Sequence, residues 1–216
     1  MTFKANDSLT EQIARFLGKR IILGEMTAGE RIQELRIAAE LDVSRGSVRE
    51  ALLILERRYL VTIYPRRGAV VSALDADAAD EFFELWFALV EQVLVAFCHS
   101  WHSEELAPFF DIGTRLTQAQ QQEDLPAYYD SAIELLEKLY PLGRNRYLQQ
   151  TLDDLLPLTQ RCFYAVLHSG KTQMAKTSEL VEATLQAITA RDENRVRSAI
   201  ADFASTYRRI LREALS

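Results

Sequence analysis

The chain has 216 residues, of which 48% are hydrophobic and 26% charged, and its formal net charge is −6. This length and apolar content allow one large domain or two small ones and exclude an intrinsically disordered chain. No apolar run approaches the roughly 20 residues of a membrane-spanning helix, and no signal-peptide core begins the chain, so we expect a cytoplasmic protein with no membrane partner. Two cysteines, Cys98 and Cys162, are too few for a disulfide framework and fit a reducing compartment.

The charge is divided unevenly along the chain. Residues 1–73 contain 12 Lys and Arg against 9 Asp and Glu, whereas residues 74–216 contain 13 against 22. A polyanion such as nucleic acid would be attracted to the first part and repelled by the second. The first part is therefore where we search for a nucleic-acid interface.

Three helical patterns come first along the chain. Apolar residues recur at helical spacing over residues 9–23 and again over 33–41. Ser44 is a suitable N-cap for a third helix, because its hydroxyl can accept a hydrogen bond from the first turn. The buried stripe of that helix is expected to consist of Val48, Leu52 and Leu55.

A β-hairpin is expected to follow the three helices. The apolar period changes to two over residues 60–64 and 69–73, and the segment Pro65–Gly68 between them predicts a tight turn. Three helices and a hairpin within about seventy residues indicate a winged helix-turn-helix. We therefore expect this domain over residues 1–73.

The remainder, residues 74–216, shows no strand pattern and predicts an all-α antiparallel helical bundle, which makes the whole chain mainly α. Ser103, Asn145 and Asp192 are expected to cap helices, and Pro157 should kink or divide one. The expected helices cover residues 77–102, 104–121, 125–141, 146–168, 172–190 and 193–214.

The start of the third helix carries the candidate DNA contacts. Arg45 and Arg49 are four residues apart and share one helix face, where either can form a bidentate pair with a guanine. Ser44 and Ser47 are short donors suited to phosphate, and the absence of a side chain at Gly46 lets the backbone approach DNA closely.

Two further arginines occupy the hairpin. Arg66 and Arg67, beside Gly68 at the turn, are placed to contact phosphate or the minor groove. The alternative is an ordinary solvated basic face, which would explain Arg45 or Arg49 alone. The cluster as a whole favours the interpretation that these residues contact DNA.

Four segments resemble the N-terminal domain of GntR-type bacterial transcriptional regulators. They are Leu9–Ala14, Leu23–Ile32, Val43–Leu52 and Pro65–Val71, and the run Val-Ser-Arg-Gly-Ser-Val-Arg-Glu-Ala-Leu is the most specific of them. One departure is Ala28, where the family usually has proline before the glycine.

The GntR resemblance assigns roles to these residues. It implies that Arg45 and Arg49 read bases, with Ser44, Ser47 and the wing as supporting contacts. It also makes Arg36, on the preceding helix, a further candidate for DNA contact.

Residues 74–216 resemble the FCD-type ligand-binding domain of the FadR subfamily. The likeness rests on Asp130, the helix break Gly143–Asn145, the pair Ala187–Ile188, Asp192 shortly after, and the position of the closing helix. Such domains are bundles that dimerise and enclose a small ligand, often around a metal held by one Asp and three His.

The metal-ligand positions of that domain are largely lost here. The four positions fall on Asp130, Glu134, Val181 and Phe203, and the family's usual Arg falls on Phe87. Two carboxylates without imidazole make a poor transition-metal site, so we expect neither metal nor cofactor, and a partly apolar pocket. Asp130 and Glu134 either face inward, where they suit a cationic or hydroxyl-rich ligand, or are solvated or paired with Arg.

Several other side chains have two interpretations. Tyr164, with Tyr128 and Tyr129, either lines the pocket or packs in the core. His99 and His102 share a helix face, as metal ligands would, but histidine is also favoured at helix C-termini, where these residues and His168 lie. The aromatic residues Phe82, Phe83, Trp86 and Phe87 are assigned to the core and the dimer interface.

These observations predict a DNA-binding transcriptional regulator. As a homodimer it would bind a pseudo-palindromic double-stranded operator, and a small-molecule effector in the bundle would modulate its affinity, most commonly to release repression. One alternative is an effector-blind dimeric DNA-binding protein. Another is an enzyme with a DNA-binding appendage, although the sequence shows no nucleophile–base pairing and no phosphate-binding glycine loop.

Overall fold

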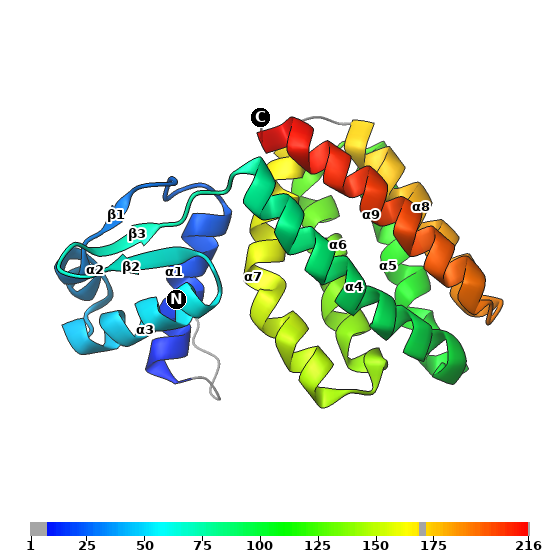
Figure 1. Cartoon of the computed structure of the whole chain (residues 1–216), viewed down its shortest axis with the longest axis horizontal. Coiled ribbons are helices and arrows are strands. Elements are labelled where there is room, and N and C mark those ends of the chain that lie inside the picture. The colour runs from blue at the N-terminus through cyan, green and yellow to red at the C-terminus, as the bar shows by residue number, and fades with distance from the viewer. Residues whose placement is uncertain (1–7, 169–171, 216) are drawn as a thin grey trace. The chain divides into compact units, whose positions relative to one another are not determined.

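The computed structural model describes residues 8–168 and 172–215. It divides into two compact units between Leu74 and Asp75, and the segment Asp154–Arg161 of helix α7 (Arg146–His168) is grouped with the first. A three-stranded sheet lies in the first unit, and the second is helical (Figure 1). The mainly α class, with a winged helix-turn-helix before an all-helical domain, is confirmed.

The first unit begins with the three predicted helices. Helix α1 packs against α3, and Gly18 of α1 makes the approach close, because a Cβ there would lie 3.3 Å from the Leu55 side chain. Ser44 caps α3 as predicted, since its Oγ accepts a hydrogen bond from the Ser47 amide at 3.0 Å. The bounds are α1 (Leu9–Ile22), α2 (Glu34–Leu41) and α3 (Arg45–Arg57).

The sheet has the strand order β1-β3-β2. The predicted hairpin consists of β2 (Val61–Tyr64) and β3 (Gly68–Val71), which pair antiparallel. The sequence did not indicate β1 (Arg31–Ile32), because two residues are too short to show a period. β1 pairs with β3, with Arg31 opposite Val70, and so places Arg31 beside the wing.

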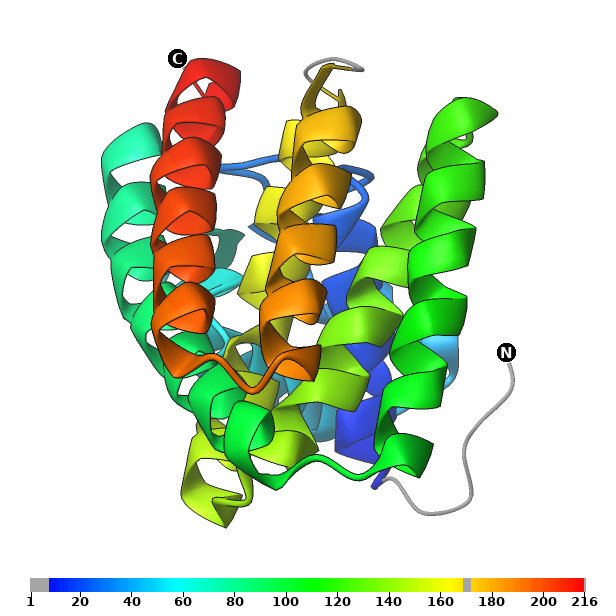
Figure 2. The same cartoon turned by 90° about the vertical axis from the view of Figure 1, so that its right-hand side faces the viewer.

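The second unit is a set of long helices (Figures 1 and 2). Helix α9 packs against both α4 and α8, and α5 packs against α6. Gly143 permits a close approach to α4, because a Cβ there would lie 3.1 Å from Cγ2 of Val93. The helices are α4 (Ala76–Ser100), α5 (Ser103–Gln121), α6 (Leu125–Leu139), the 3-10 helix η1 (Tyr140–Gly143), α7, α8 (Thr172–Thr189) and α9 (Glu193–Leu215).

The helix starts follow their predicted caps with one exception. Asn145 accepts hydrogen bonds from two amides of α7, and Asp192 accepts one from the Arg195 amide at 3.0 Å. Ser103 is not a cap, since α5 starts one residue earlier than expected and His102 takes the N-cap position. The His102 amide donates to Oε2 of Glu105 at 2.9 Å, which stabilises this start.

Two prolines inside or beside helices differ in their effect. Pro157 is expected to kink or divide its helix, and it does not divide it, since α7 runs from Arg146 to His168. Proline removes one intrahelical hydrogen bond and does not always end a helix. Near Pro141, by contrast, α6 ends at Leu139, two residues earlier than expected, and the chain continues as η1.

Helix α4 corrects the expectation that no segment is apolar enough to span a membrane. Among the described residues it is long and apolar enough to do so by length and composition. Many of its apolar residues are core: Phe83, Val93 and Phe97 are fully buried, and Trp86 donates from Nε1 to the Tyr140 hydroxyl at 3.1 Å, whereas Leu85 is 53% exposed. Burial in the helical unit accounts for part of the apolar composition of this helix.

Candidate nucleic-acid interface and effector cavity

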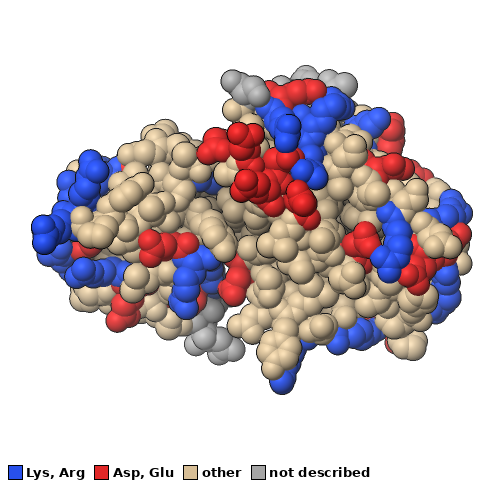
Figure 3. Space-filling model, viewed as in Figure 1, with Lys and Arg blue, Asp and Glu red and all other residues tan. Residues whose placement is uncertain are grey.

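Four arginines from three parts of the first unit line one groove of about 630 Å³. Arg31 comes from β1, Arg45 and Arg49 come from α3, and Arg66 comes from the turn between β2 and β3. We call it the arginine groove. Figure 3 shows basic side chains gathered over the end of this unit that carries the hairpin turn.

Arg45 and Arg49 both line the groove and are exposed, as a base-reading pair requires. The Arg45 side chain is 62% exposed, and its Nε donates to Oε2 of Glu34 at 2.7 Å. Glu34 is the first residue of α2, eleven residues earlier in the chain. Nothing in the sequence indicated this contact, because it depends on how α2 and α3 cross.

The serines at the start of α3 form the helix cap. The hydroxyls of Ser44 and Ser47 lie 2.8 Å apart, and both residues retain some exposure. Gly46 between them is exposed, and a Cβ there would meet only Oγ of Ser44 at 3.6 Å. Packing therefore does not require glycine at this position, which leaves close approach of a ligand to the backbone as a reason for it.

The wing brings Arg31 to the arginines of the hairpin. Arg66 and Arg67 are exposed at the turn, where Arg66 and Gly68 have φ of 62° and 81°. Arg31, Arg66 and Arg67 also border a second hollow, of about 480 Å³. A Cβ on Gly68 would lie 3.9 Å from Nε of Arg31, so the Arg31 side chain runs beside the turn. Only the pairing of β1 with β3 reveals this residue.

Arg36, the remaining DNA-contact candidate, does not line the arginine groove. It is exposed on α2 and lines a separate hollow of about 300 Å³ together with Arg20 and Arg31. The structure thus separates Arg36 from Arg45 and Arg49.

The helical unit contains a small apolar cavity of about 60 Å³. Three of the expected effector residues, Phe87, Val181 and Phe203, line it. Thr184 also lines it, but its hydroxyl donates to the Leu180 carbonyl of its own helix at 2.8 Å. The lining is therefore almost wholly apolar, whereas the FCD resemblance led us to expect a partly apolar pocket.

The two expected carboxylates do not line this cavity, which corrects the inward-facing interpretation. Asp130 is exposed. Glu134 is half-buried and lies 2.7 Å from Nη2 of Arg115 and 3.7 Å from Nζ of Lys138. Because ion pairing satisfies this carboxylate, the pairing alternative describes Glu134, and the solvated one describes Asp130.

Tyr164 does not line the cavity either. Its ring packs against Tyr129 at 5.9 Å and against His168 at 4.0 Å between centroids. Tyr128 is buried and donates its hydroxyl hydrogen bond to the Met174 carbonyl at 3.1 Å. Burial raises the pKa of Tyr128 and, more strongly, that of Tyr129. Tyr128 follows the core-packing interpretation, whereas Tyr129 and Tyr164 are partly exposed and pack against each other.

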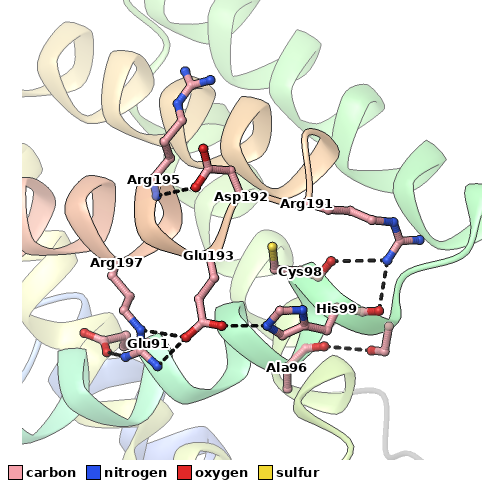
Figure 4. Close-up of polar contacts among 10 residues, drawn as sticks. Glu91, Ala96, Cys98, His99, Arg191, Asp192, Glu193, Arg195 and Arg197 are labelled. Carbon is pink, nitrogen blue, oxygen red and sulfur yellow. Dashed lines mark hydrogen bonds and ion pairs between the residues drawn. The ribbon is translucent and has the colours of Figure 1, made fainter.

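His99 and His102 have separate structural roles, and Figure 4 shows the contacts of His99. Nε2 of His99 lies 2.7 Å from Oε2 of Glu193 at the start of α9, and Glu193 also pairs with Arg197. Arg191 donates to the carbonyls that end α4, including that of His99 at 2.9 Å. Within residues 8–168 and 172–215, no three His, Cys, Asp or Glu side chains are grouped to hold a metal ion.

The chain matches two family models in succession. Residues 9–71 match the gntR family of bacterial regulatory proteins, and residues 73–205 match the FCD domain.

Two curated relatives are regulators. The HTH-type transcriptional regulator YdhC of Bacillus subtilis (strain 168) is 27% identical over 155 residues, which cover 68% of this chain and 66% of that protein. An HTH-type transcriptional regulator in the TAR-I ttuE-ttuC' intergenic region of Agrobacterium vitis is 29% identical over 103 residues, which cover 46% of this chain and 60% of that protein. The chain therefore spans less than two thirds of the length of these relatives.

Solved structures share the fold over nearly the whole chain. McbR/YncC of E. coli has a TM-score of 0.82 at 20% identity, covering 97% of this chain and 100% of that one. A GntR transcriptional regulator from Rhodococcus sp. RHA1 has a TM-score of 0.70 at 21% identity, covering 93% and 98%. Since the FCD match alone covers more than half of the sequence, the chain belongs to the FCD-domain proteins, and a domain of the gntR family of bacterial regulatory proteins precedes its FCD domain.

Proposed function

We propose that this chain is a sequence-specific DNA-binding transcriptional regulator. It consists of a winged helix-turn-helix domain over residues 1–73 and an effector-binding and dimerisation domain over residues 74–216. The observation that carries the proposal is the arginine groove, where guanidinium groups from β1, α3 and the wing converge. Arginine is the residue best suited to bind both guanine edges and phosphates bidentately.

Each part of the groove has a role in this proposal. The first turns of α3 enter the major groove, where Arg45 and Arg49 read bases. The serine cap and the exposed amides at the start of α3 contact phosphate. Arg31, Arg66 and Arg67, together at the wing, contact phosphate or the minor groove of the same half-site.

The helical domain pairs two copies of the chain in this proposal. A two-fold dimer places two α3 helices in successive major grooves, so the operator is a pseudo-palindrome with half-sites about 10 base pairs apart. A small molecule in the helical domain favours one arrangement of the two DNA-binding domains and releases repression. The family membership supports this arrangement.

In vitro selection tests the proposal. The purified full-length chain is incubated with random double-stranded DNA, and the bound duplexes are amplified and sequenced over several rounds. We expect one enriched motif with two inverted half-sites, both protected in footprinting. If the selection enriches no sequence motif, sequence-specific recognition is refuted.

A second candidate is an effector-blind dimeric regulator, and the observation in its favour is the small size of the described cavity that Phe87, Val181 and Phe203 line. The cavity measures about 60 Å³, whereas sites for small molecules usually occupy about 300–1,000 Å³. Thermal shifts across a metabolite panel separate the candidates, because an effector at 100 times its dissociation constant stabilises the protein by about 2.7 kcal/mol. A panel that includes apolar compounds and shifts nothing favours the effector-blind regulator.

A further inference from the structure

A carboxylate lines the arginine groove, where it opposes the proposed ligand. Glu34 is part of the groove lining, and its side chain is only 17% exposed. A negative charge on a surface that binds DNA weakens binding, because it repels phosphates. Its presence there points to a contribution other than direct attraction of the duplex.

The contact of Glu34 identifies that contribution. Oε2 of Glu34 accepts a hydrogen bond from Nε of Arg45 at 2.7 Å, and the Arg45 side chain is 62% exposed. The pair joins the first residue of α2 to the first residue of α3. It engages one of five guanidinium N–H groups, so Nη1 and Nη2 keep four donors for another acceptor.

A pre-positioned guanidinium has an advantage in base recognition. An arginine side chain loses rotamer freedom when it binds, and a contact that holds it beforehand removes part of that cost. With Nε engaged by Glu34, the pair of terminal nitrogens is the face that remains for O6 and N7 of a guanine.

We propose that Glu34 is a positioning residue for base recognition, which holds the Arg45 guanidinium for end-on bidentate contact with one guanine in each half-site. The inference rests on the proposed DNA-binding function. The competing role for Glu34 is structural, since an acidic residue in the first turn of α2 interacts favourably with the helix dipole and stabilises the helix. That role would change stability but not base preference.

Two substitutions separate positioning from charge. Glu34→Gln and Glu34→Ala remove the same charge, but glutamine keeps an oxygen that can accept from Arg45. Both should therefore raise binding to a scrambled duplex equally. Glu40→Gln is the matched control, because Glu40 lies exposed on the same helix, pairs with Arg20 and lies outside the arginine groove.

The probe is the duplex selected by the wild-type chain, with each guanine of one half-site replaced in turn by 7-deazaguanine. This replacement removes the N7 acceptor, and loss of a hydrogen bond to a charged donor weakens binding about tenfold. We expect one guanine at which the wild type and Glu40→Gln show this loss and Arg45→Ala does not. Glu34→Ala should lose most of the sensitivity at that guanine, and Glu34→Gln should retain an intermediate part.

The possible outcomes are distinguishable. A wild type that enriches no motif refutes the proposed function itself. If the wild type enriches a motif, the inference is overturned by full 7-deazaguanine sensitivity in Glu34→Ala, or by a motif in which no guanine is sensitive through Arg45. Melting temperatures verify that each variant folds. If Glu34→Ala does not fold, the comparison of Glu34→Gln with Glu40→Gln decides, since only Glu34→Gln should lose part of the 7-deazaguanine sensitivity.

Discussion

The two units of this chain place their charged residues in different ways. In the first unit, the arginine groove leaves guanidinium groups accessible, with one carboxylate among them. In the helical unit, carboxylates pair with arginines on neighbouring helices, as Glu134 does with Arg115, while the cavity is apolar. The excess of acidic residues in the second unit therefore does not indicate a ligand site, because some of these carboxylates form ion pairs that connect helices.

One of these connections joins the start of α4 to the end of α9. Asp80 is buried and accepts hydrogen bonds from Nε of Arg208 at 2.6 Å and from Nη2 of Arg212 at 2.6 Å. The hydrogen bonds from Arg208 and Arg212 hold the pKa of the Asp80 carboxyl well below its usual range. Charge here stabilises the fold, whereas charge in the groove is available to a partner.

The largest expected effect tests the structural role of charge in the helical unit. Asp80→Ala should lower the free energy of unfolding of this unit by about 2 kcal/mol, because charge-assisted hydrogen bonds are lost while the two arginines keep access to solvent. Urea unfolding followed by circular dichroism measures the change. Glu84→Ala is the control, since Glu84 is 74% exposed and lies 3.5 Å from Arg208, so its removal should cost little. A loss below about 1 kcal/mol in Asp80→Ala would contradict this role.

The same carboxylate predicts a pH dependence of the helical unit. Because the pKa of Asp80 is lower in the folded state than in the unfolded state, its contribution is complete above the unfolded value of about 3.9 and is lost as pH falls towards the folded value. Below about pH 4 the free energy of unfolding should fall more steeply with decreasing pH in the wild type than in Asp80→Asn, which has no carboxyl to protonate at this position. Equal acid dependence of the two proteins would show that Asp80 does not contribute.

In the first unit, substitution should change binding and not folding. Arg49→Ala should weaken binding to the selected operator by about 1–3 kcal/mol, because a bidentate base contact is lost. Its unfolding free energy should stay within about 0.5 kcal/mol of the wild type, since the side chain is exposed. Competition assays with operator variants measure the specificity, and unchanged sequence preference would refute the assigned base contact.

The wing should contribute affinity without sequence preference. Arg66→Ala should weaken binding to all duplexes alike and reduce the magnitude of the salt slope by about 1, because one phosphate contact is lost. Titrations of operator and scrambled duplex at several salt concentrations give the slope. A normal slope would mean that Arg66 does not contact phosphate.

The smallest effect separates stability from function within one residue. Gly46→Ala should raise the free energy of unfolding by about 0.5–1 kcal/mol, because alanine is the better helix former and the new Cβ meets only Oγ of Ser44 at 3.6 Å. Operator affinity should fall in the same variant if the backbone approaches DNA there. Chemical denaturation and binding assays on one preparation test both, and a stabilised variant with unchanged affinity would remove Gly46 from the interface.

Local patterns predicted most of the first unit. The helical periods, the Ser44 cap and the change to period two located α1, α3 and the hairpin, and the same reasoning found the caps Asn145 and Asp192. Such signals depend on residues close in sequence, whose spacing is set by one helix or one strand. Predictions that depended on how separate elements pack together were less successful. Asp130 and Glu134, for example, do not line the cavity as one interpretation expected.

What the sequence determined by itself is the order of the elements, the basic character of α3 and the wing, and the absence of histidine at Val181 and Phe203, where the FCD resemblance places metal ligands. Only the tertiary structure decided that Arg31 joins the wing, that Glu34 holds Arg45, and that Glu134 pairs with Arg115 outside the cavity. The reason is physical: a helix or a turn is selected by contacts a few residues apart, whereas the partner of a charged side chain depends on how separate elements cross.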